Sequence, residues 1–331
     1  MKMRSLISLV VTAVATAVLA TLLVTSTTST AQAAPEQVTT ATAVSAKPRN
    51  PSQDFPRMPR ECATPKEKIP AKPVVCQLNP YDADRPTIVL WGDSHSWMFI
   101  PALKAAVQGR GVNLIGVMMG SCPPMDNQVA PDDSVPACFR SNALAIDVAR
   151  KLEASGRPYR IVLAGSWQRY VHARKVRDRV SYVGMMAAAM VKATPRLART
   201  LKAIGSDVDV IGQVATVPER HRDCAKGNEP YSCQLARGKS LPEAAATRRY
   251  VAQALKPVLG TRKPIDVNAR FCGAKVCRGL VGSTHTWFDD LHLSATMSAT
   301  LKSYFTRTVD AVVPSTEPPP VDPGCPLIIF C

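Results

Sequence analysis

The chain has 331 residues and a formal net charge of +16, and it is 46% hydrophobic, 20% charged and 5% aromatic. The apolar share excludes wholesale disorder, and 17 glycines exclude a collagen-like repeat. With 28 prolines the chain is a poor candidate for a simple helical bundle, while its length suits one large domain or two small ones.

The N-terminus predicts an export signal. Lys2 and Arg4 precede an uncharged stretch at residues 6–24, and Ala31-Gln32-Ala33 provides small residues for cleavage near Ala33. The stretch is also just long enough to stay attached as a membrane anchor. In both cases we expect the rest of the chain outside the cytoplasm, secreted or in the cell envelope, and we favour cleavage.

An alternation of strands and helices follows a predicted flexible linker at residues 34–60. Short apolar runs predict strands, and amphipathic patterns between them predict helices. The strands are expected at residues 87–91, 112–119, 160–164, 208–211 and 264–267, and the helices at 97–108, 141–154, 183–204, 242–259 and 294–312. This alternation implies parallel pairing, so residues 61–313 are expected to form one α/β domain, a three-layer α/β/α sandwich with a mostly parallel five-stranded sheet. Residues 314–331 are a Pro-rich tail.

The ten cysteines fall into sequential pairs with short gaps, which suggests disulfides in an exported chain, although the sequence alone leaves their connectivity open. Zinc is the competing interpretation, but no gap is C-x-x-C and no histidine clusters with the cysteines, so we expect no metal. The expected pairs are Cys62–Cys76, Cys122–Cys138, Cys224–Cys233, Cys272–Cys277 and Cys325–Cys331.

The first predicted strand runs into Trp91-Gly92-Asp93-Ser94-His95-Ser96. A glycine permits a sharp turn into a helix, which leaves Ser94 at the N-terminus of that helix, where free backbone N–H groups gather. A serine there can act as a nucleophile, with its own N–H facing a developing oxyanion. The alternative is that Ser94 only caps the helix. The loops that leave the next two strands, residues 120–124 and 165–169, should converge on the same crevice.

A second motif, Trp287-Phe288-Asp289-Asp290-Leu291-His292-Leu293-Ser294, lies near the other end of the chain. A hydroxyl nucleophile needs a base, and the base needs a carboxylate that holds its tautomer. Asp289 precedes His292 by three residues and can bond the far ring nitrogen, whereas Asp290 is two residues away and is the weaker candidate. Ser294 is expected to cap the last helix.

These two blocks resemble the first and last sequence blocks of the SGNH (GDSL-like) hydrolase superfamily. The resemblance is stronger still to the SGNH domains joined to acyltransferase-3 membrane proteins, the surface-polysaccharide O-acetyltransferases of the OafA type. Three further features fit that branch in order: Gly120-Ser121-Cys122-Pro123-Pro124 followed by Cys138, the segment at residues 162–167, and Phe271-Cys272 to Cys277. The resemblance covers about residues 60–312.

The resemblance implies a role for each matching residue. Ser94 would be the nucleophile, His292 the base and Asp289 its orienting partner, and the N–H groups of Ser94 and Gly120 would form part of the oxyanion hole. Typical SGNH hydrolases add an asparagine in the third block, where this chain has Gly165-Ser166-Trp167. Ser166, through its hydroxyl or amide, is the candidate substitute. No cofactor is implied.

Substrate-binding candidates are less specific. Trp91 and Trp167 end neighbouring predicted strands and could stack on sugars, although packing in the core is at least as compatible with the pattern. Arg169 opens a basic run that could attract an anionic surface glycan, while a solvated face is the simpler interpretation. His95 is too close to Ser94 in sequence to be its usual base. No nucleic-acid-binding motif is present.

We therefore expect acyl-ester chemistry, usually with acetyl groups in this family, on an acylated carbohydrate or surface glycan. With water as acceptor the protein would be an esterase, and with a sugar hydroxyl an O-acetyltransferase. In fused relatives a membrane region delivers the acyl group, and this chain has no multi-span region, so a separate membrane acyl-transfer partner or a free esterase is expected. The alternative is a non-catalytic SGNH-like module that binds glycan.

Overall fold

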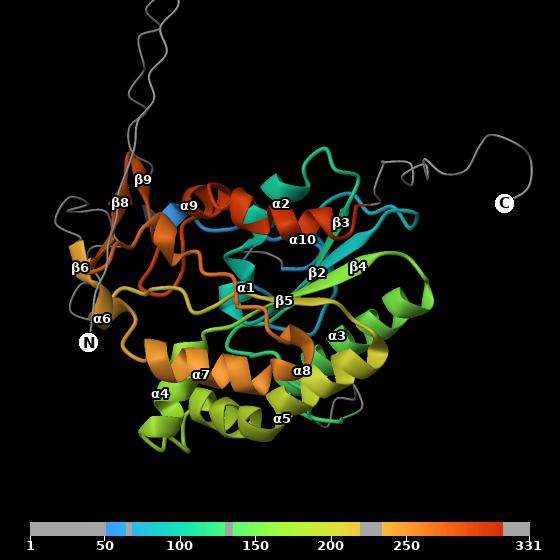
Figure 1. The fold of residues 1–331 in the computed structure, drawn as a ribbon, viewed down its shortest axis with the longest axis horizontal. Coiled ribbons are helices and arrows are strands. Elements are labelled where there is room, and N and C mark those ends of the chain that lie inside the picture. The colour runs from blue at the N-terminus through green and yellow to red at the C-terminus, as the bar shows by residue number, and fades with distance from the viewer. Residues whose placement is uncertain (1–50, 64–67, 130–134, 219–233, 314–331) are drawn as a thin grey trace, which may run out of the picture. The chain divides into compact units, whose positions relative to one another are not determined.

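The computed structural model describes residues 51–63, 68–129, 135–218 and 234–313 (Figure 1). The predicted signal at residues 1–33, the tail at 314–331 and the expected pairs Cys224–Cys233 and Cys325–Cys331 lie outside the described residues. Within the described ranges, no helix combines the length and hydrophobicity needed to cross a bilayer.

A five-stranded sheet forms the centre of the fold (Figure 1). Its strands are β1 (Cys76–Gln77), β2 (Thr87–Gly92), β3 (Asn113–Met118), β4 (Tyr159–Ala164) and β5 (Val208–Val210), in the order β1-β3-β2-β4-β5. β1 is antiparallel to β3, and the other neighbours are parallel. Gly92 at the end of β2 pairs with Met118 and with Ala164, so three strands end at the same level.

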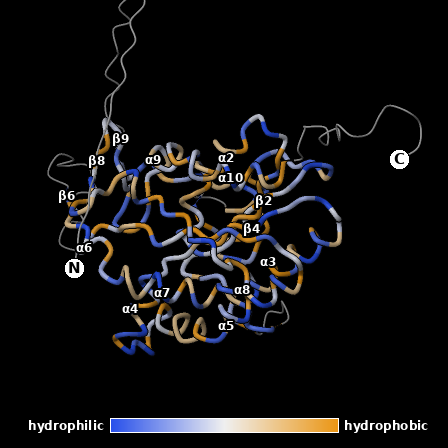
Figure 2. Tube along the Cα trace, in the orientation of Figure 1, coloured by the Kyte–Doolittle hydropathy of each residue, from blue (hydrophilic) through white to orange (hydrophobic). Residues whose placement is uncertain are grey.

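The central strands are buried on both faces, and alternate side chains enter two separate cores. Ile88 and Leu90 of β2 belong to one core, while Val89 and Trp91 belong to the other. β3 and β4 divide in the same way, as expected for a pleated strand covered on both sides. Figure 2 accordingly shows the strands as a hydrophobic centre.

Helices cover both faces of the sheet (Figure 1), which confirms the predicted three-layer sandwich. One layer contains α2 (Ile100–Val107), α9 (Ala295–Ala299), η4 (Lys302–Phe305) and α10 (Thr306–Asp310). The other contains α3 (Ala137–Ala154), α4 (Trp167–Lys175), α5 (Tyr182–Ile204), α7 (Ala244–Ala254) and α8 (Lys256–Leu259). Short elements complete the described chain: η1 (Pro51–Gln53), α1 (Ser94–Trp97), β6 (Gln234–Ala236), α6 (Arg237–Ser240), η3 (Asn268–Arg270), β7 (Val276–Arg278), β8 (Leu280–Val281) and β9 (Thr284–His285).

The fifth strand differs from the prediction. Residues 264–267 make a single bridge, between Ile211 and Ile265, instead of a strand. Pro264 has no N–H to donate to a ladder, which explains the early end of this pairing. The fifth place in the sheet is taken by β1 at the opposite edge, a two-residue strand that was not predicted.

Three predicted helices are shorter or interrupted. The helix expected at residues 97–108 is divided into α1 and α2, with Pro101 in the first turn of α2, where proline is tolerated. The 242–259 pattern is divided between α7 and α8, and Pro257 again lies in the first turn of the second piece. The 294–312 pattern becomes α9, η4 and α10, with Ser294 capping α9 as predicted through a bond from the Met297 N–H.

The packed chain starts before residue 61, the expected boundary of the linker. Phe55 and Met58 are buried, and the Phe55 ring lies 6.3 Å from Trp97 and 6.1 Å from Phe288. Asp54 also accepts the N–H of Ala295 at 2.7 Å through its carbonyl oxygen. Residues 51–58 therefore form part of the wall behind the DDLHLS segment.

Candidate active site

The turn from β2 into α1 depends on Gly92. Its φ is +152°, and a Cβ at this position would lie only 1.8 Å from the carbonyl oxygen of Ala164 on β4. A glycine is therefore required where the chain leaves the sheet. Ser94 follows as the first residue of α1, half-buried, with its backbone N–H outside the hydrogen-bonding ladder of the helix.

Asp93, and not Ser94, caps this helix. Its carboxylate accepts the N–H of His95 at 2.8 Å, the N–H of Ser166 at 2.9 Å and the hydroxyl of Tyr170 at 2.8 Å. Asp93 is completely buried, and this burial raises its pKa, while the three hydrogen bonds and the charge of His292 act in the opposite direction. The carboxylate thus joins the start of α1 to the loop after β4 and to α4.

Asp289 and His292 form a hydrogen-bonded pair. Nδ1 of His292 lies 2.8 Å from Oδ2 and 3.0 Å from Oδ1 of Asp289, and the N–H groups of Leu291 and His292 donate to Oδ1 at 2.8 and 2.7 Å. Burial acts to raise the pKa of Asp289, but the hydrogen bond and charge of His292 and the two N–H donors outweigh it and lower this pKa. An ionised carboxylate only accepts, so Nδ1 carries a proton, and in the neutral form of the ring Nε2 presents a lone pair.

Aromatic rings hold the imidazole against α1. Phe288 stacks on His292 at a centroid distance of 5.6 Å, Trp97 meets it edge-on at 5.7 Å, and the His95 ring lies 5.5 Å away. Nε2 of His292 is buried and has no hydrogen-bond partner among the described residues, so the Ser94 hydroxyl is not bonded to it here. Catalytic hydrogen bonds of this kind often form fully only when substrate is bound.

Gly120 lies in a tight turn beside the end of β2. The N–H of Cys122 donates to the carbonyl of Met119 at 3.1 Å, and the N–H of Met119 donates to the carbonyl of Gly92 at 3.2 Å. Ser121 has a φ of +54°, which is the type II pattern and is strained for a residue with a side chain. Gly120 donates no hydrogen bond within the described residues, so its amide remains available to an oxyanion.

Ser166 is different, because its amide is bound to Asp93. Of the two groups that sequence reasoning offered for a third oxyanion donor, only the hydroxyl remains.

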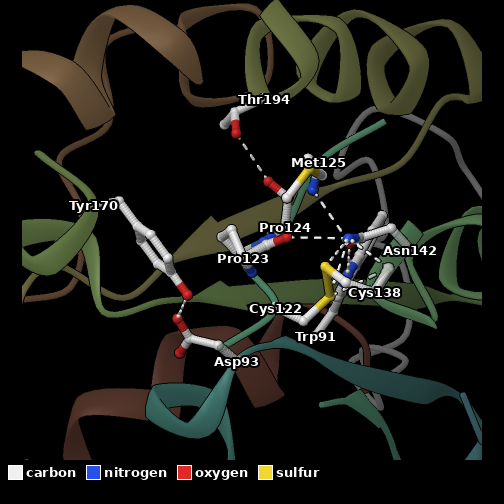
Figure 3. Close-up of a disulfide and its surroundings, with 10 residues drawn as sticks. All are labelled: Trp91, Asp93, Cys122, Pro123, Pro124, Met125, Cys138, Asn142, Tyr170 and Thr194. Carbon is white, nitrogen blue, oxygen red and sulfur yellow. Dashed lines mark hydrogen bonds between the residues drawn. A yellow bond between two sulfur atoms is a disulfide. The ribbon is translucent and has the colours of Figure 1, made fainter. Parts of the chain in front are cut away.

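A disulfide and an asparagine anchor the Gly120 turn to α3 (Figure 3). Cys122 is bonded to Cys138, as predicted. One helical turn further, the buried Asn142 donates to the carbonyl of Pro123 at 3.1 Å and accepts the N–H of Met125 at 3.2 Å and Nε1 of Trp91 at 2.8 Å. The predicted pairs Cys62–Cys76 and Cys272–Cys277 are also bonded.

Removing the Cys122–Cys138 bond should impair the site more than the fold. In the double variant Cys122→Ser/Cys138→Ser we expect a loss of about 3 kcal/mol in unfolding free energy for a cross-link of this span. Turnover of p-nitrophenyl acetate should fall roughly ten- to hundredfold, because the Gly120 amide moves. The control is Cys272→Ser/Cys277→Ser, which should keep most of the activity. The cysteines of that pair are 5 residues apart in the sequence, whereas Cys122 and Cys138 are 16 residues apart. Full activity in the first variant would contradict this expectation.

The tryptophans proposed as a sugar-stacking surface are not available for that role. Trp91 is 2% exposed and Trp167 is fully buried, with Nε1 of Trp167 donating to the carbonyl of Ile211 at 2.9 Å. Both rings pack in the core between the sheet and α3–α5. Trp91 lies on the face of β2 that these helices cover, and Trp167 lies on the face of α4 that is turned toward the sheet. The core alternative is therefore correct. Arg169 is exposed on the first turn of α4.

His95 is buried beside His292, and both of its ring nitrogens lack partners among the described residues. Burial is the main cause that holds the pKa of His95 well below the usual value, and the charges of His292 and Arg169 add to it. The His95 ring beside His292 is therefore neutral.

The sheet order, the short helix that opens with Ser94 and the His292–Asp289 pair define an α/β sandwich of the SGNH hydrolase type. The chain belongs to the family of SGNH domains fused to AT3 domains, whose family model matches residues 61–307. This membership places it among ester hydrolases and acyltransferases.

Solved structures with a similar fold include the periplasmic domain of a lipopolysaccharide acetyltransferase from Salmonella ser. Paratyphi A. That alignment has 16% identity and a TM-score of 0.48, and it covers 69% of this chain and 85% of that one. A Bacteroides fragilis protein assigned as an acylhydrolase aligns with 10% identity and a TM-score of 0.39, over 71% of this chain and 91% of that one. No curated protein sequence matches this chain.

Sequence reasoning missed the residues that support the site. Asp93, Tyr170 and Asn142 are buried polar side chains with partners far away in the sequence. Tyr170 donates to Asp93, which is 77 residues away, and Trp91 donates to Asn142, which is 51 residues away. A usable signal existed for Asp93 alone, because an aspartate directly before a short helix is a favoured N-cap.

Proposed function

We propose that this protein transfers acyl groups to or from hydroxyls of an extracytoplasmic glycan, with Ser94, His292 and Asp289 as its catalytic triad. One observation carries the proposal: Nδ1 of His292 lies 2.8 Å from Asp289, Nε2 has no partner among the described residues, and the ring packs edge-on against Trp97 of α1, the helix that begins with Ser94. A nucleophile, a base and an orienting carboxylate are the three groups that a catalytic triad requires.

Acylation follows from these groups. The Ser94 hydroxyl attacks the ester carbonyl while its proton moves to Nε2 of His292. The N–H groups of Ser94 and Gly120 bind the oxyanion of the tetrahedral intermediate. As the intermediate collapses, the imidazolium returns the proton to the leaving alcohol, and the acyl group stays on Ser94 as an ester.

Deacylation repeats the sequence with a second hydroxyl. His292 takes the proton of water or of a sugar hydroxyl, the new tetrahedral intermediate collapses, and Ser94 regains its proton from the imidazolium. Water yields a free carboxylic acid, and a sugar hydroxyl yields a new ester. Exclusion of water and binding of the sugar decide between the two outcomes.

The proposed location and substrate class rest on several features of the chain. Three disulfides among the described residues are typical of an oxidising compartment, and the apolar N-terminus resembles an export signal. A net charge of +16 favours an anionic surface polymer as substrate. The family's fusion to AT3 domains supports an acetyl donor delivered by such a membrane protein.

The decisive experiment compares the wild type with Ser94→Ala. The wild type should hydrolyse p-nitrophenyl acetate, and the variant should lose this activity by a factor on the order of 10⁴ or more while remaining folded by circular dichroism. Ser96→Ala is the matched control, because its hydroxyl donates to the Asp93 carbonyl and takes no part in the chemistry. Equal rates in the wild type and Ser94→Ala would leave only a glycan-binding module.

Transfer is distinguished from hydrolysis by adding an acceptor. A transferase should pass acetyl from the p-nitrophenyl ester to an oligosaccharide, detected as a mass increase of the sugar, whereas an esterase should release only acetate. Mass spectrometry of surface-glycan acetylation in cells with and without the protein identifies the natural product.

A further inference from the structure

Exposed large apolar side chains gather at one corner of the described structure. We call residues 176–185, which join α4 to α5, the α4–α5 corner. Val180 is 92% exposed, Val176 57%, Met185 49% and Tyr182 39%. The rest of the described chain exposes only Val75, Tyr81 and Val191 among its large hydrophobic residues. Single exposed residues are ordinary, but a cluster of four in ten residues indicates a binding surface.

The same corner carries unpaired positive charge. Arg177 and Arg179 are exposed, and their side chains make no ion pair or hydrogen bond within the described ranges. Neighbouring cations on α4 are partly engaged: Lys175 binds Glu243 at 2.9 Å, and Arg174 lies 5.4 Å from the centre of the Tyr250 ring. The acidic residue of the corner is Asp178.

The backbone of the corner is a fixed turn that holds these side chains outward. Arg177 has a φ of +56°, in the left-handed region that residues with a side chain rarely adopt. The Asp178 carboxylate accepts the N–H groups of Val180 and Ser181 at 3.1 and 3.0 Å, and the Ser181 hydroxyl accepts the N–H of Gly184 as the cap of α5. The exposure of Val180 is therefore set by a hydrogen-bonded turn.

The corner adjoins the candidate active site. α4 begins three residues after β4 ends, and the charge of Arg169 in its first turn acts on His95 beside His292. A surface pocket of about 470 Å³ beside the corner is lined by Ser121 of the Gly120 turn, by Arg169 and by corner residues that include Val176 and Tyr182.

We propose that the α4–α5 corner docks the protein onto a bilayer that contains anionic lipid. Val180 and its exposed apolar neighbours would enter the interface, and Arg177 and Arg179 would bind lipid phosphates. A hydrated anionic polysaccharide also attracts arginines, but it offers no apolar surface for Val180, so the composition of the corner favours the bilayer. This docking does not depend on the chemistry proposed for Ser94.

Quenching of a single exposed tryptophan tests the proposal in the full chain. The four native tryptophans are at most 3% exposed, so Val180→Trp adds an accessible indole. Its fluorescence should be quenched by brominated acyl chains in vesicles of phosphatidylcholine with phosphatidylglycerol, and much less without phosphatidylglycerol. Val75→Trp, at an exposed valine elsewhere, is the matched control and should show little quenching. Equal quenching at both positions would overturn the proposal.

The charge requirement is tested in the Val180→Trp background. Arg177→Gln/Arg179→Gln should weaken binding to the anionic vesicles roughly thirtyfold, because each cation near such a surface contributes about 1 kcal/mol to the binding free energy. Lys104→Gln/Lys302→Gln removes the same charge from the opposite helical layer and should change binding by less than about twofold. Ester hydrolysis should be unchanged in both. Unaltered vesicle binding in the arginine variant would overturn the proposal. A second result would also overturn it: no binding to vesicles, together with binding to alginate, an anionic polysaccharide, that is unchanged in Val180→Asp.

Discussion

Asp289→Asn is expected to lower kcat for p-nitrophenyl acetate by about 10⁴, the scale found when a triad carboxylate becomes an amide. The N–H groups of Leu291 and His292 both donate to Oδ1, so the amide oxygen of the asparagine should take that place. Its NH₂ group then replaces Oδ2, the atom closest to Nδ1 of His292, and donates to the ring. The ring proton moves to Nε2, and the lone pair that accepts the Ser94 proton is lost.

Asp290→Asn is the matched control for this experiment. Its backbone carbonyl accepts the N–H of Val217 at 2.9 Å, a contact that the substitution leaves in place. We expect less than a tenfold change in kcat. Nitrogen-15 chemical shifts of the His292 ring should report the change of tautomer in Asp289→Asn alone. If Asp290→Asn lost the activity and Asp289→Asn kept it, the assignment of the orienting carboxylate would be wrong.

Gly92→Ala should cause the largest loss of stability of any single substitution considered. The added Cβ would lie 1.8 Å from a backbone oxygen of Ala164, and no flexible side chain can move aside to relieve that contact. β2 and β4 would have to separate next to the bond between the Asp93 carboxylate and the Ser166 amide. We expect the unfolding free energy in urea to fall by roughly 3–5 kcal/mol.

Gly109→Ala separates steric collision from backbone strain. Gly109 also has a positive φ, +71°, but a Cβ there has nothing within 4 Å. Its substitution should therefore cost only the conformational strain, about 1 kcal/mol. If Gly92→Ala and Gly109→Ala lost the same unfolding free energy, the collision of the new Cβ of residue 92 with Ala164 would contribute nothing, and this expectation would be wrong.

The sheet and its helices could be predicted because their signals are local. Apolar runs of four to eight residues marked β2, β3, β4 and β5, and amphipathic patterns marked the long α3 and α5. β1 escaped prediction because a two-residue strand has no periodicity of its own and exists only through its pairing with Ile115 and Gly116. α4 was also missed, since three of its nine residues are cations and its buried face includes the polar Gln168 beside Trp167 and Tyr170.

The candidate site likewise has a part that local sequence predicts and a part that depends on distant contacts. By itself the sequence determined the short-range part: a serine after a glycine turn, an aspartate three residues before a histidine, and pairs of cysteines at short spacing. Only the tertiary structure decided that Asp93 caps α1, that Trp91 and Trp167 belong to the core, and that aromatic rings from both ends of the chain enclose His292. The physical reason is range. Turn and capping preferences act over a few residues, whereas burial and buried hydrogen bonds depend on partners that the chain brings together only when it folds.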